Sequence, residues 1–149
     1  MDSKDRRIIA ALQAAGRMSN QNLSERVNLS APPCLRRLEG AGVIRGYTAL
    51  VDERAHGLPV TAFVRLQLHD GGTVAAFEAA VGRMDAVLDC SIMTGDADHL
   101  LRAPMESLAD YERFVRARLH AVPGIGSIDT SFAYGHVKRA TVFPPASGP

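Results

Sequence analysis

Apolar positions at the start of the chain recur every three or four residues, which is the spacing of one face of a helix. The first such stretch begins after Asp2, ends at Gly16 and carries its apolar face on Ile8 or Ile9, Leu12 and Ala15. Asp2 is a candidate N-cap, and a glycine suits the C-terminal end of a helix. The pattern predicts one amphipathic helix.

Two shorter helices are predicted next, each opened by a serine. Ser19 and Ser30 are good N-caps because a serine oxygen accepts hydrogen bonds from the unpaired amides of a first helical turn. Asn28 tolerates the left-handed conformation that ends the first of these helices, and Gly42 ends the second. The residues expected to face the core are Leu23 and Val27 in the first helix and Cys34, Leu38 and Ala41 in the second.

The segment from Val43 to Val51 is β-rich and predicts a short strand, the wing of a winged helix-turn-helix. A polar stretch with Gly57 and Pro59 follows and indicates a linker. We therefore expect a DNA-binding domain at residues 1–51 and a linker at residues 52–60.

From residue 61 the apolar period alternates between strand and helix. The predicted order is a strand at Ala62, Val64, Leu66 and Leu68; a helix at Val74, Phe77, Ala80, Val81 and Met84; a strand at Leu88, Cys90 and Ile92; a strand from His99 to Ala103; a helix at Leu108, Tyr111, Val115, Leu119 and Val122; and a strand at Ile128, Thr130, Phe132 and Tyr134. The order βαββαβ predicts a ferredoxin-like α+β domain at residues 61–143, with four antiparallel strands and two helices on one face. The uncovered face predicts a dimer, and residues 144–149 are expected to be a flexible tail.

Two local signals refine the second domain. Thr94-Gly95-Asp96-Ala97 places glycine at the first central position of a two-residue II′ turn, which needs a positive φ. Pro104 lacks an amide proton, so it should close the strand after Ala103 or sit on an edge.

Charge is divided unevenly along the chain. Residues 1–50 hold eight Lys and Arg against four Asp and Glu, a net charge of +4, whereas residues 51–149 hold nine against twelve, a net charge of −3. A basic module joined to a mildly acidic one favours a DNA-binding domain attached to a domain with another task. Arg36 and Arg37 lie off the apolar stripe, about 100° apart around the helix axis, so one of them at most can point straight into a groove while the other reaches a phosphate.

Composition narrows the remaining possibilities. The chain of 149 residues with 46% apolar content can bury one or two small cores, and its 22% charged content excludes an extended disordered chain. No apolar run approaches the roughly 20 residues that span a bilayer, and MDSKDRR lacks the apolar segment of a signal peptide, so a cytoplasmic protein is expected. Cys34 and Cys90 are expected to be small buried side chains, and the five histidines show no metal-ligand spacing.

The chain from Asp2 to about Lys138 resembles the Lrp/AsnC family of bacterial and archaeal feast/famine transcription regulators. The segments that carry the resemblance are MDSKDRRIIAALQAAGRMSNQNLSERVNLS, PPCLRRLEGAGVIRGYTALVD, GDADHLLR and VPGI. The resemblance implies an N-terminal winged helix-turn-helix and a C-terminal amino-acid-binding domain. It also implies dimers that pair through their sheets and linking segments, frequent octamers, and effectors held between dimers near the GDADHLL hairpin.

One segment departs from the family pattern. The family's recognition helix usually runs Cys-Leu-x-Arg-Val-x-x-Leu-Glu before Gly-Val-Ile, whereas CLRRLEGAGVI has three residues fewer between Cys34 and Leu38. Three residues amount to about 4.5 Å and about 300° of helix, so the residues after the gap return about 60° out of register. We therefore expect a recognition helix one turn short. The residues expected to bind DNA are Ser30, Pro32, Leu35, Arg36, Arg37 and Arg45.

The hairpin is the expected effector site, because a turn that presents backbone amides and carboxylates can hold both ends of an amino-acid zwitterion. The residues expected to bind the effector are Thr94, Gly95, Asp96, Asp98 and His99. The alternative is a solvated hairpin in which the two aspartates only form the turn. The loop with Gly126 and Ser127 is a second candidate for the same pocket.

The sequence thus predicts a regulator that binds double-stranded DNA, responds to a small molecule, expected to be an amino acid, and forms a homodimer, with no cofactor or metal. The resemblance implies that such dimers assemble to an octamer. The alternative is a ligand-binding partner of such regulators that binds DNA weakly because its recognition helix is short. An Lrp-like enzyme, of which the siroheme decarboxylases are an example, is the third reading. It lacks support because the histidines are scattered and the sequence has no P-loop or Rossmann glycine pattern.

Overall fold

The computed structural model describes residues 1–28, 30–69 and 74–144, and these divide into two compact units. The first unit is Met1–Leu50 together with the chain end that begins at Val137, and the second is Val51–His136. The sequence limits at 51, 60 and 143 stay predictions, and the predicted tail lies outside the described residues except for residue 144. None of the helices in the described ranges is long and apolar enough to cross a membrane.

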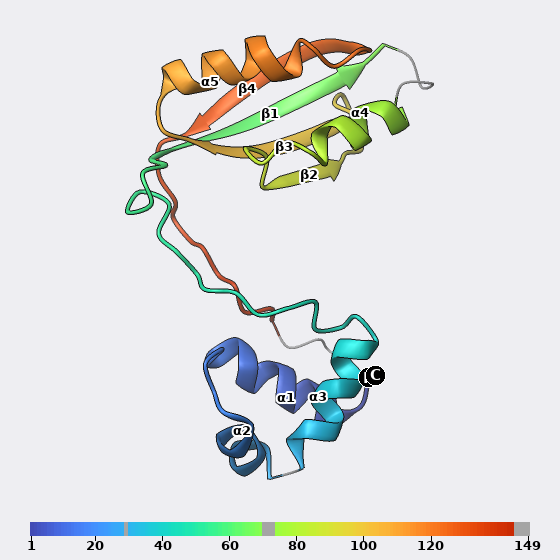
Figure 1. The fold of residues 1–149 in the computed structure, drawn as a ribbon, viewed down its shortest axis with the longest axis vertical. Coiled ribbons are helices and arrows are strands. Elements are labelled where there is room, and N and C mark those ends of the chain that lie inside the picture. The colour runs from blue at the N-terminus through green and yellow to red at the C-terminus, as the bar shows by residue number, and fades with distance from the viewer. Residues whose placement is uncertain (29, 70–73, 145–149) are drawn as a thin grey trace. The chain divides into compact units, whose positions relative to one another are not determined.

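Three helices form the first unit: α1 (Ser3–Ala14), α2 (Asn20–Val27) and α3 (Ala31–Gly40) (Figure 1). Asp2 caps α1 as predicted, in a reciprocal pair in which the Asp5 amide donates to Asp2 (2.8 Å) and the Asp2 amide donates to Asp5 (3.0 Å). Ser19 accepts from the Asn22 amide at 3.1 Å, and Asn28 ends α2 at φ 51°. The predicted starts of α1 and α2 are confirmed.

The N-terminus of α3 differs from the prediction. Within the described chain the Ser30 hydroxyl accepts no capping hydrogen bond. The reason is local, because the second and third positions of α3 are Pro32 and Pro33, and a capping oxygen needs an amide proton at one of these two positions. The Ala31 amide instead donates to the Ser24 hydroxyl of α2 at 3.1 Å.

The core-facing stripe of α3 is also different from the predicted one. The buried residues of the first unit are Ile8, Ala11, Leu23, Val27, Ala31, Leu35 and Leu38. Leu35 is 6% exposed, whereas Cys34 is half-buried and Ala41 is exposed after the helix ends at Gly40. The stripe that the helix buries starts at its first residue and continues at i+4 and i+7, so Leu35 belongs to the core and not to the outer face.

The strand expected over Val43–Val51 is not formed in the described residues of that segment. The amides of Val43 and Ile44 both donate to the Leu38 carbonyl, which ends α3, and Gly42 takes a φ of +68° there. A strand needs a neighbouring strand to pair with, and none is present beside this segment in the described chain. Leu50 is left 76% exposed and Val51 63% exposed.

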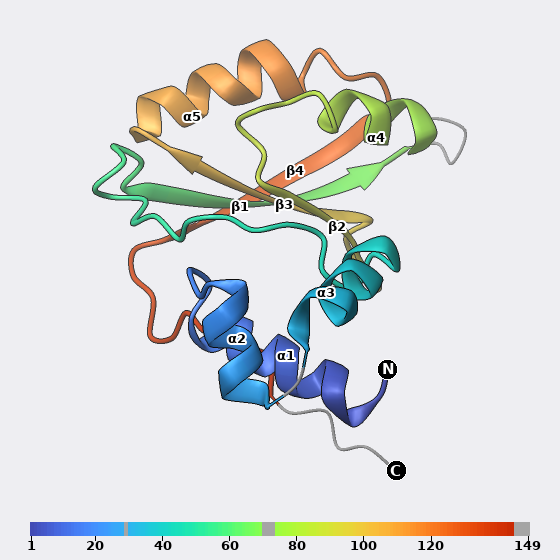
Figure 2. The same ribbon diagram turned by 60° about the horizontal axis from the view of Figure 1, so that its bottom comes forward.

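The second unit is an antiparallel sheet in the order β2-β3-β1-β4. Its elements are β1 (Val60–Leu68), α4 (Val74–Val81), β2 (Asp89–Ile92), β3 (His99–Met105), α5 (Leu108–Phe114) with a π-helical continuation (Val115–Leu119), and β4 (Ile125–Ala133). Both helices lie on the same face of the sheet (Figure 2). The ferredoxin-like βαββαβ prediction is confirmed.

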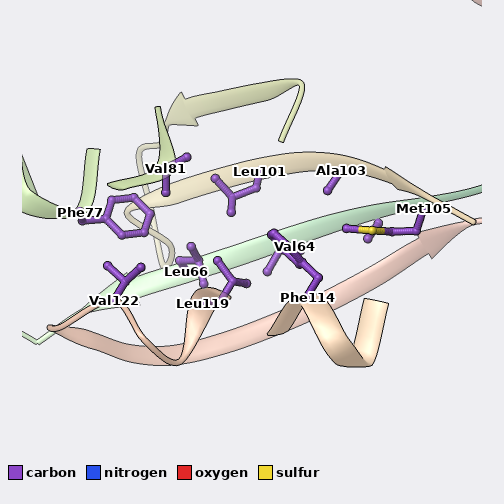
Figure 3. Close-up of a cluster of buried hydrophobic side chains, with 11 residues drawn as sticks. Val64, Leu66, Phe77, Val81, Leu101, Ala103, Met105, Phe114, Leu119 and Val122 are labelled. Atoms are coloured by element: carbon purple, nitrogen blue, oxygen red, sulfur yellow. The ribbon is translucent and has the colours of Figure 1, made fainter. Parts of the chain in front are cut away.

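Alternate residues of the central strands fill the space beneath the helices (Figure 3). The fully or nearly buried residues of this core are Ala62, Val64, Leu66, Phe77, Val81, Leu101, Ala103, Met105, Phe114, Leu119 and Val122. The strand residues among them occur at every second position, as the sequence pattern predicts. The core holds both helices on the sheet and fixes which strand residues face away from it.

Strand β3 continues through Pro104 to Met105, so the prediction that proline closes it at Ala103 is wrong. The last partner of β2 is Arg102, whose carbonyl accepts from the Leu88 amide at 2.9 Å and therefore points toward β2. Residue 104 points to the same side, two residues further on and beyond the end of β2. A missing amide proton costs little there because that side is an edge, which agrees with the other half of the expectation for this proline.

Strand β2 is less buried than its alternating pattern predicts. Leu88 is 56% exposed, Ile92 is 77% exposed, and Cys90 is exposed and not the buried thiol expected. β2 is a four-residue edge strand, so its helix-facing side chains have strand neighbours on one side only.

We predict that Leu35→Ala destabilises the first unit by about 2–5 kcal/mol, because it removes a buried side chain and leaves a cavity. Leu35→Met conserves volume and should cost less than about 1.5 kcal/mol. Hydrogen exchange of the α1–α3 amides measures both. A Leu35→Met variant that keeps these amides protected but loses DNA affinity would contradict the core assignment.

Candidate DNA-binding and effector sites

The outer face of α3 carries the candidate DNA contacts of the first unit. Arg36 and Pro33 are exposed, Pro32 is half-buried, and Arg36 forms no ion pair with the residues described. Arg36 lines a groove of about 290 Å³ together with Leu12, Gly16, Met18, Asn20, Pro32, Leu35, Glu39 and Tyr47. The Arg36 guanidinium is therefore available to a phosphate or a base edge.

Arg37 is engaged within the unit. Its Nη2 donates to Asp5 Oδ1 at 2.6 Å and lies 3.5 Å from Asp2 Oδ2. Asp5 is 4% exposed, so its carboxylate needs a partner, and Arg37 is the cation that supplies one. This ion pair joins the start of α1 to α3 and holds the Arg37 guanidinium at Asp5, while the side chain stays 57% exposed; its expected DNA contact stays a prediction.

The same contacts shift the ionisation of the groups involved. Hydrogen bonding to Asp5 raises the pKa of Arg37, and the backbone amide of Asp5 is the main cause that lowers the pKa of Asp2 below its usual 3.8. Because the folded pKa of Asp2 is lowered, its contribution to stability is fully present above pH 3.8 and is lost as the pH falls through the lower folded value.

The remaining predicted DNA-binding residues are divided between surface and core. Ser30 and Arg45 are exposed, the latter on the irregular segment after α3, whereas Leu35 is buried and cannot present a side chain to a base. Tyr47, which the sequence did not single out, donates to Glu39 Oε1 at 2.9 Å beside Arg36. Burial and this bond to Glu39 raise the pKa of the tyrosine. Tyr47 lies ten positions beyond Arg37 and belongs to no sequence pattern that would have identified it.

The hairpin between β2 and β3 is the candidate effector site of the second unit. Gly95 has a φ of +106°, as its position predicts. The strands last pair at Ile92 and His99, and the Met93 amide donates to the Asp98 carbonyl at 2.8 Å, so the connection is longer than the predicted two-residue turn. Thr94, Gly95 and Asp96 are exposed together at its tip.

Asp98 ties the hairpin to the end of β1. Its carboxylate accepts from the Leu68 amide at 2.7 Å, and its own amide donates to the Leu66 carbonyl at 2.9 Å. One carboxylate oxygen of Asp98 is thus used to close the end of a central strand.

Gln67 connects the two loops that the sequence proposed separately. Its side-chain amide donates to the Asp96 carbonyl, and its side-chain oxygen accepts from the Ser127 hydroxyl at 2.7 Å. A Cβ at Gly126, next to Ser127, would lie 2.8 Å from Nδ1 of His69, so a larger residue here would require the exposed His69 ring to move. Gln67 was missed because its role depends on the strand order, which places β1 between β3 and β4 so that its outward residue at this end adjoins both loops.

His99 does not share the exposed surface of the hairpin tip. It pairs with Leu66 across the sheet, faces the helices and is 2% exposed. Its ring packs on Phe77 with centroids 4.6 Å apart, and its Nε2 lies 3.5 Å from Glu78 Oε1. The structure therefore places His99 apart from the exposed tip, because the first residue of β3 falls on the buried side of the sheet, and its expected role in effector binding stays a prediction. In the ranges that the structure covers, no group of three His, Cys, Asp or Glu could hold a metal ion.

Two family models match the chain. One, described as the Lrp/AsnC ligand binding domain, matches residues 61–143, and the other, the AsnC-type helix-turn-helix domain, matches residues 1–40. A leucine-responsive regulatory protein of Rhizobium meliloti (strain 1021) is 39% identical over 145 residues, which is 94% of this chain and 93% of the relative. The DNA-binding transcriptional activator DecR of Escherichia coli (strain K12) is 36% identical over 149 residues, 97% of this chain and 98% of the relative.

Solved structures agree over the same length. The transcriptional regulator NMB0573 of Neisseria meningitidis, crystallised as an L-Met complex, matches with a TM-score of 0.87 and 35% identity over 97% of this chain and 96% of its own. An AsnC family transcriptional regulator of Agrobacterium tumefaciens matches with a TM-score of 0.85 and 31% identity over 97% of both chains.

We predict that Asp98→Ala raises the hydrogen-exchange rate of the Leu68 amide by about tenfold or more, because a hydrogen bond to a charged acceptor contributes about 1.5–3 kcal/mol. Asp96→Ala is the matched control, since residue 96 is held through its backbone carbonyl. Equal exchange rates of Leu68 in the two variants would contradict the role of Asp98.

Proposed function

The chain belongs to the Lrp/AsnC family of transcription regulators, and on that premise we propose that it binds double-stranded DNA through α3 and an amino acid at the hairpin tip. The observation that carries the DNA proposal is the division of the two adjacent arginines of α3. Arg37 is held by Asp5, and Arg36 is exposed without an ion pair among described residues. Of the two, Arg36 is thus the side chain available to enter a groove.

Electrostatics supports this orientation. Residues 1–50 carry a net charge of +4, from eight basic and four acidic side chains. Such a surface attracts DNA without sequence preference, and Ser30 and Arg45 are exposed to add phosphate contacts. Base recognition then rests on the few side chains that α3 presents outward, chiefly Arg36 and Pro33, because Leu35 is withdrawn into the core.

The effector proposal rests on the tip of the hairpin. Asp96 offers a carboxylate to an ammonium group, and the exposed backbone of Thr94 and Gly95 offers hydrogen bonds to a carboxylate. Gln67 and Ser127 hold this tip against the neighbouring loop, which gives the site a fixed frame. A related regulator crystallised with L-Met supports an amino acid as the ligand class.

We also propose an assembly of homodimers, with an octamer as its final form, and a cytoplasmic location beside the DNA. The sheet face that carries no helix supports pairing of two copies. We propose no catalytic activity, in keeping with relatives that are named as regulators.

A second candidate function is a ligand-binding partner of such regulators that contacts DNA weakly. The observation that favours it is the length of α3, which has ten residues and gives one of its two adjacent arginines to Asp5. The DNA experiment below separates the two functions.

We predict that Arg36→Ala lowers affinity for a fragment carrying the promoter of the chain's own gene by about tenfold or more, since a lost bidentate base contact costs about 1–3 kcal/mol. Arg36→Ala should leave thermal stability unchanged, whereas Arg37→Ala should lower it by leaving Asp5 buried without its cation. Fluorescence anisotropy across salt concentrations and thermal denaturation measure the two effects.

Arg83→Ala, which removes an exposed arginine of the second unit, is the matched control and should bind DNA as the parent does. Absence of a specific complex for the parent chain would favour the ligand-binding partner. Loss of DNA binding in a fully stable Arg37→Ala variant, with Arg36→Ala unaffected, would overturn the division of the two arginines.

For the effector, we predict that one or more amino acids raise the melting temperature of the chain, and that Asp96→Asn weakens that ligand by about tenfold or more by removing the charge opposite its ammonium group. Asp129→Asn, an exposed aspartate on β4 paired with Arg65, is the control for a lost surface charge. An amino acid that binds Asp96→Asn as tightly as the parent would place the site elsewhere.

A further inference from the structure

A cavity of about 400 Å³ lies between α4 and the edge strand β2, apart from the exposed hairpin tip. Its lining residues are Glu78, Val81, Gly82, Val87, Leu88, Asp89, Cys90, Ile92 and His99. This volume falls in the range of small-molecule sites, which are mostly apolar with a few placed polar groups.

His99 is the polar group that points to a ligand. It is 2% exposed, and neither ring nitrogen has a hydrogen-bond partner among the described residues. A buried imidazole without a partner costs free energy, and natural proteins leave few such groups. The Glu78 carboxylate lies 3.5 Å from Nε2 without making a hydrogen bond, so both groups can share a donor placed between them.

The charge of the lining defines the ligand. Glu78 and Asp89 are acidic, and none of the described residues in the lining is a lysine or an arginine. Partial removal from solvent and the charges of these same two carboxylates raise the pKa of the Cys90 thiol. A cation is favoured here, and a carboxylate is disfavoured.

The side walls of the cavity indicate the chemistry of the rest of the ligand. Val81, Val87, Leu88 and Ile92 form an apolar surface, and Leu88 and Ile92 are exposed there at 56% and 77%. An alkyl chain would cover this apolar surface and remove it from water.

From the unpaired His99, the adjacent Glu78 and the apolar wall, we propose that the cavity between α4 and β2 binds a primary alkylamine. The ammonium group donates to Glu78 and to a ring nitrogen of His99, and the alkyl chain packs on Val81, Val87 and Ile92. An ammonium suits this pair because it has three donors and no acceptor. A free amino acid is rejected, because its carboxylate would face Glu78 and Asp89 without a cation. The cavity thus binds a different chemical class of ligand from the hairpin tip, and this proposal does not depend on the function proposed for the tip.

The test uses the full chain with 3-methylbutylamine as the probe, compared with 3-methylbutanol and leucine. Calorimetry should show that the amine binds at least tenfold more tightly than the alcohol, and leucine, which the hairpin tip can bind, is compared through the His99 resonances. In the parent, the ring nitrogen resonances of His99 should shift with the amine and stay unchanged with leucine.

Glu78→Gln should weaken amine binding at least tenfold and leave any amino-acid response of the hairpin unchanged. Asp85→Asn is the matched control, because Asp85 is exposed close in sequence to β2 and does not line the cavity. The proposal is overturned if the amine does not shift the His99 resonances, if the alcohol binds as tightly as the amine, or if Glu78→Gln and Asp85→Asn bind the amine equally well.

Discussion

The buried carboxylate of Asp5 is the constraint on which the DNA-binding unit depends. A charge that is 96% removed from solvent must be paired and hydrogen-bonded, and Asp5 obtains this from the Asp2 amide and the Arg37 guanidinium. The pair fixes α3 against the start of α1 and takes Arg37 out of the set of free cations. What remains outward on α3, chiefly Arg36, is what the helix can offer to DNA. One buried acid therefore pairs with one of two adjacent arginines and leaves the other without an ion pair among the described residues.

The second unit contains a buried polar side chain, His99, that among the described residues lacks the hydrogen bonds Asp5 has in the first unit. His99 is buried as deeply as Asp5 but has no hydrogen-bond partner in the described chain. Its position follows from the pleat of β3, which places residue 99 on the helix side opposite Leu66, while the tip of the same hairpin faces water. The two ends of one short connection thus meet different surroundings. In the two proposals, the exposed tip binds a zwitterion and the buried end binds a cation with an apolar chain.

Much of this fold follows from local signals in the sequence. The caps at Asp2 and Ser19, the left-handed Asn28, the positive φ of Gly95 and the order of strands and helices are consequences of short-range geometry, and all are present. The sequence predictions fail where a neighbouring residue or strand determines the local structure. Two prolines remove the amides that Ser30 would cap, Leu35 faces the core because of where α3 begins, and β2 is exposed because it is an edge. The residues Arg37, Gln67 and His99 acquire their roles from partners 32, 29 and 33 residues away, which no periodicity reveals.

The recognition helix α3 is shorter than the pattern typical of the family. With three residues fewer between Cys34 and Leu38, α3 has little outward surface, so we expect one arginine, Arg36, to make most of its DNA contact. The most direct test is the side-chain NMR spectrum of the arginines in the full chain, recorded while its promoter fragment is added. We expect the Nε resonance of Arg36 to shift on binding while that of Arg37 keeps the position set by Asp5. A shift of Arg37 with Arg36 unchanged would contradict the assignment of the DNA contact to Arg36.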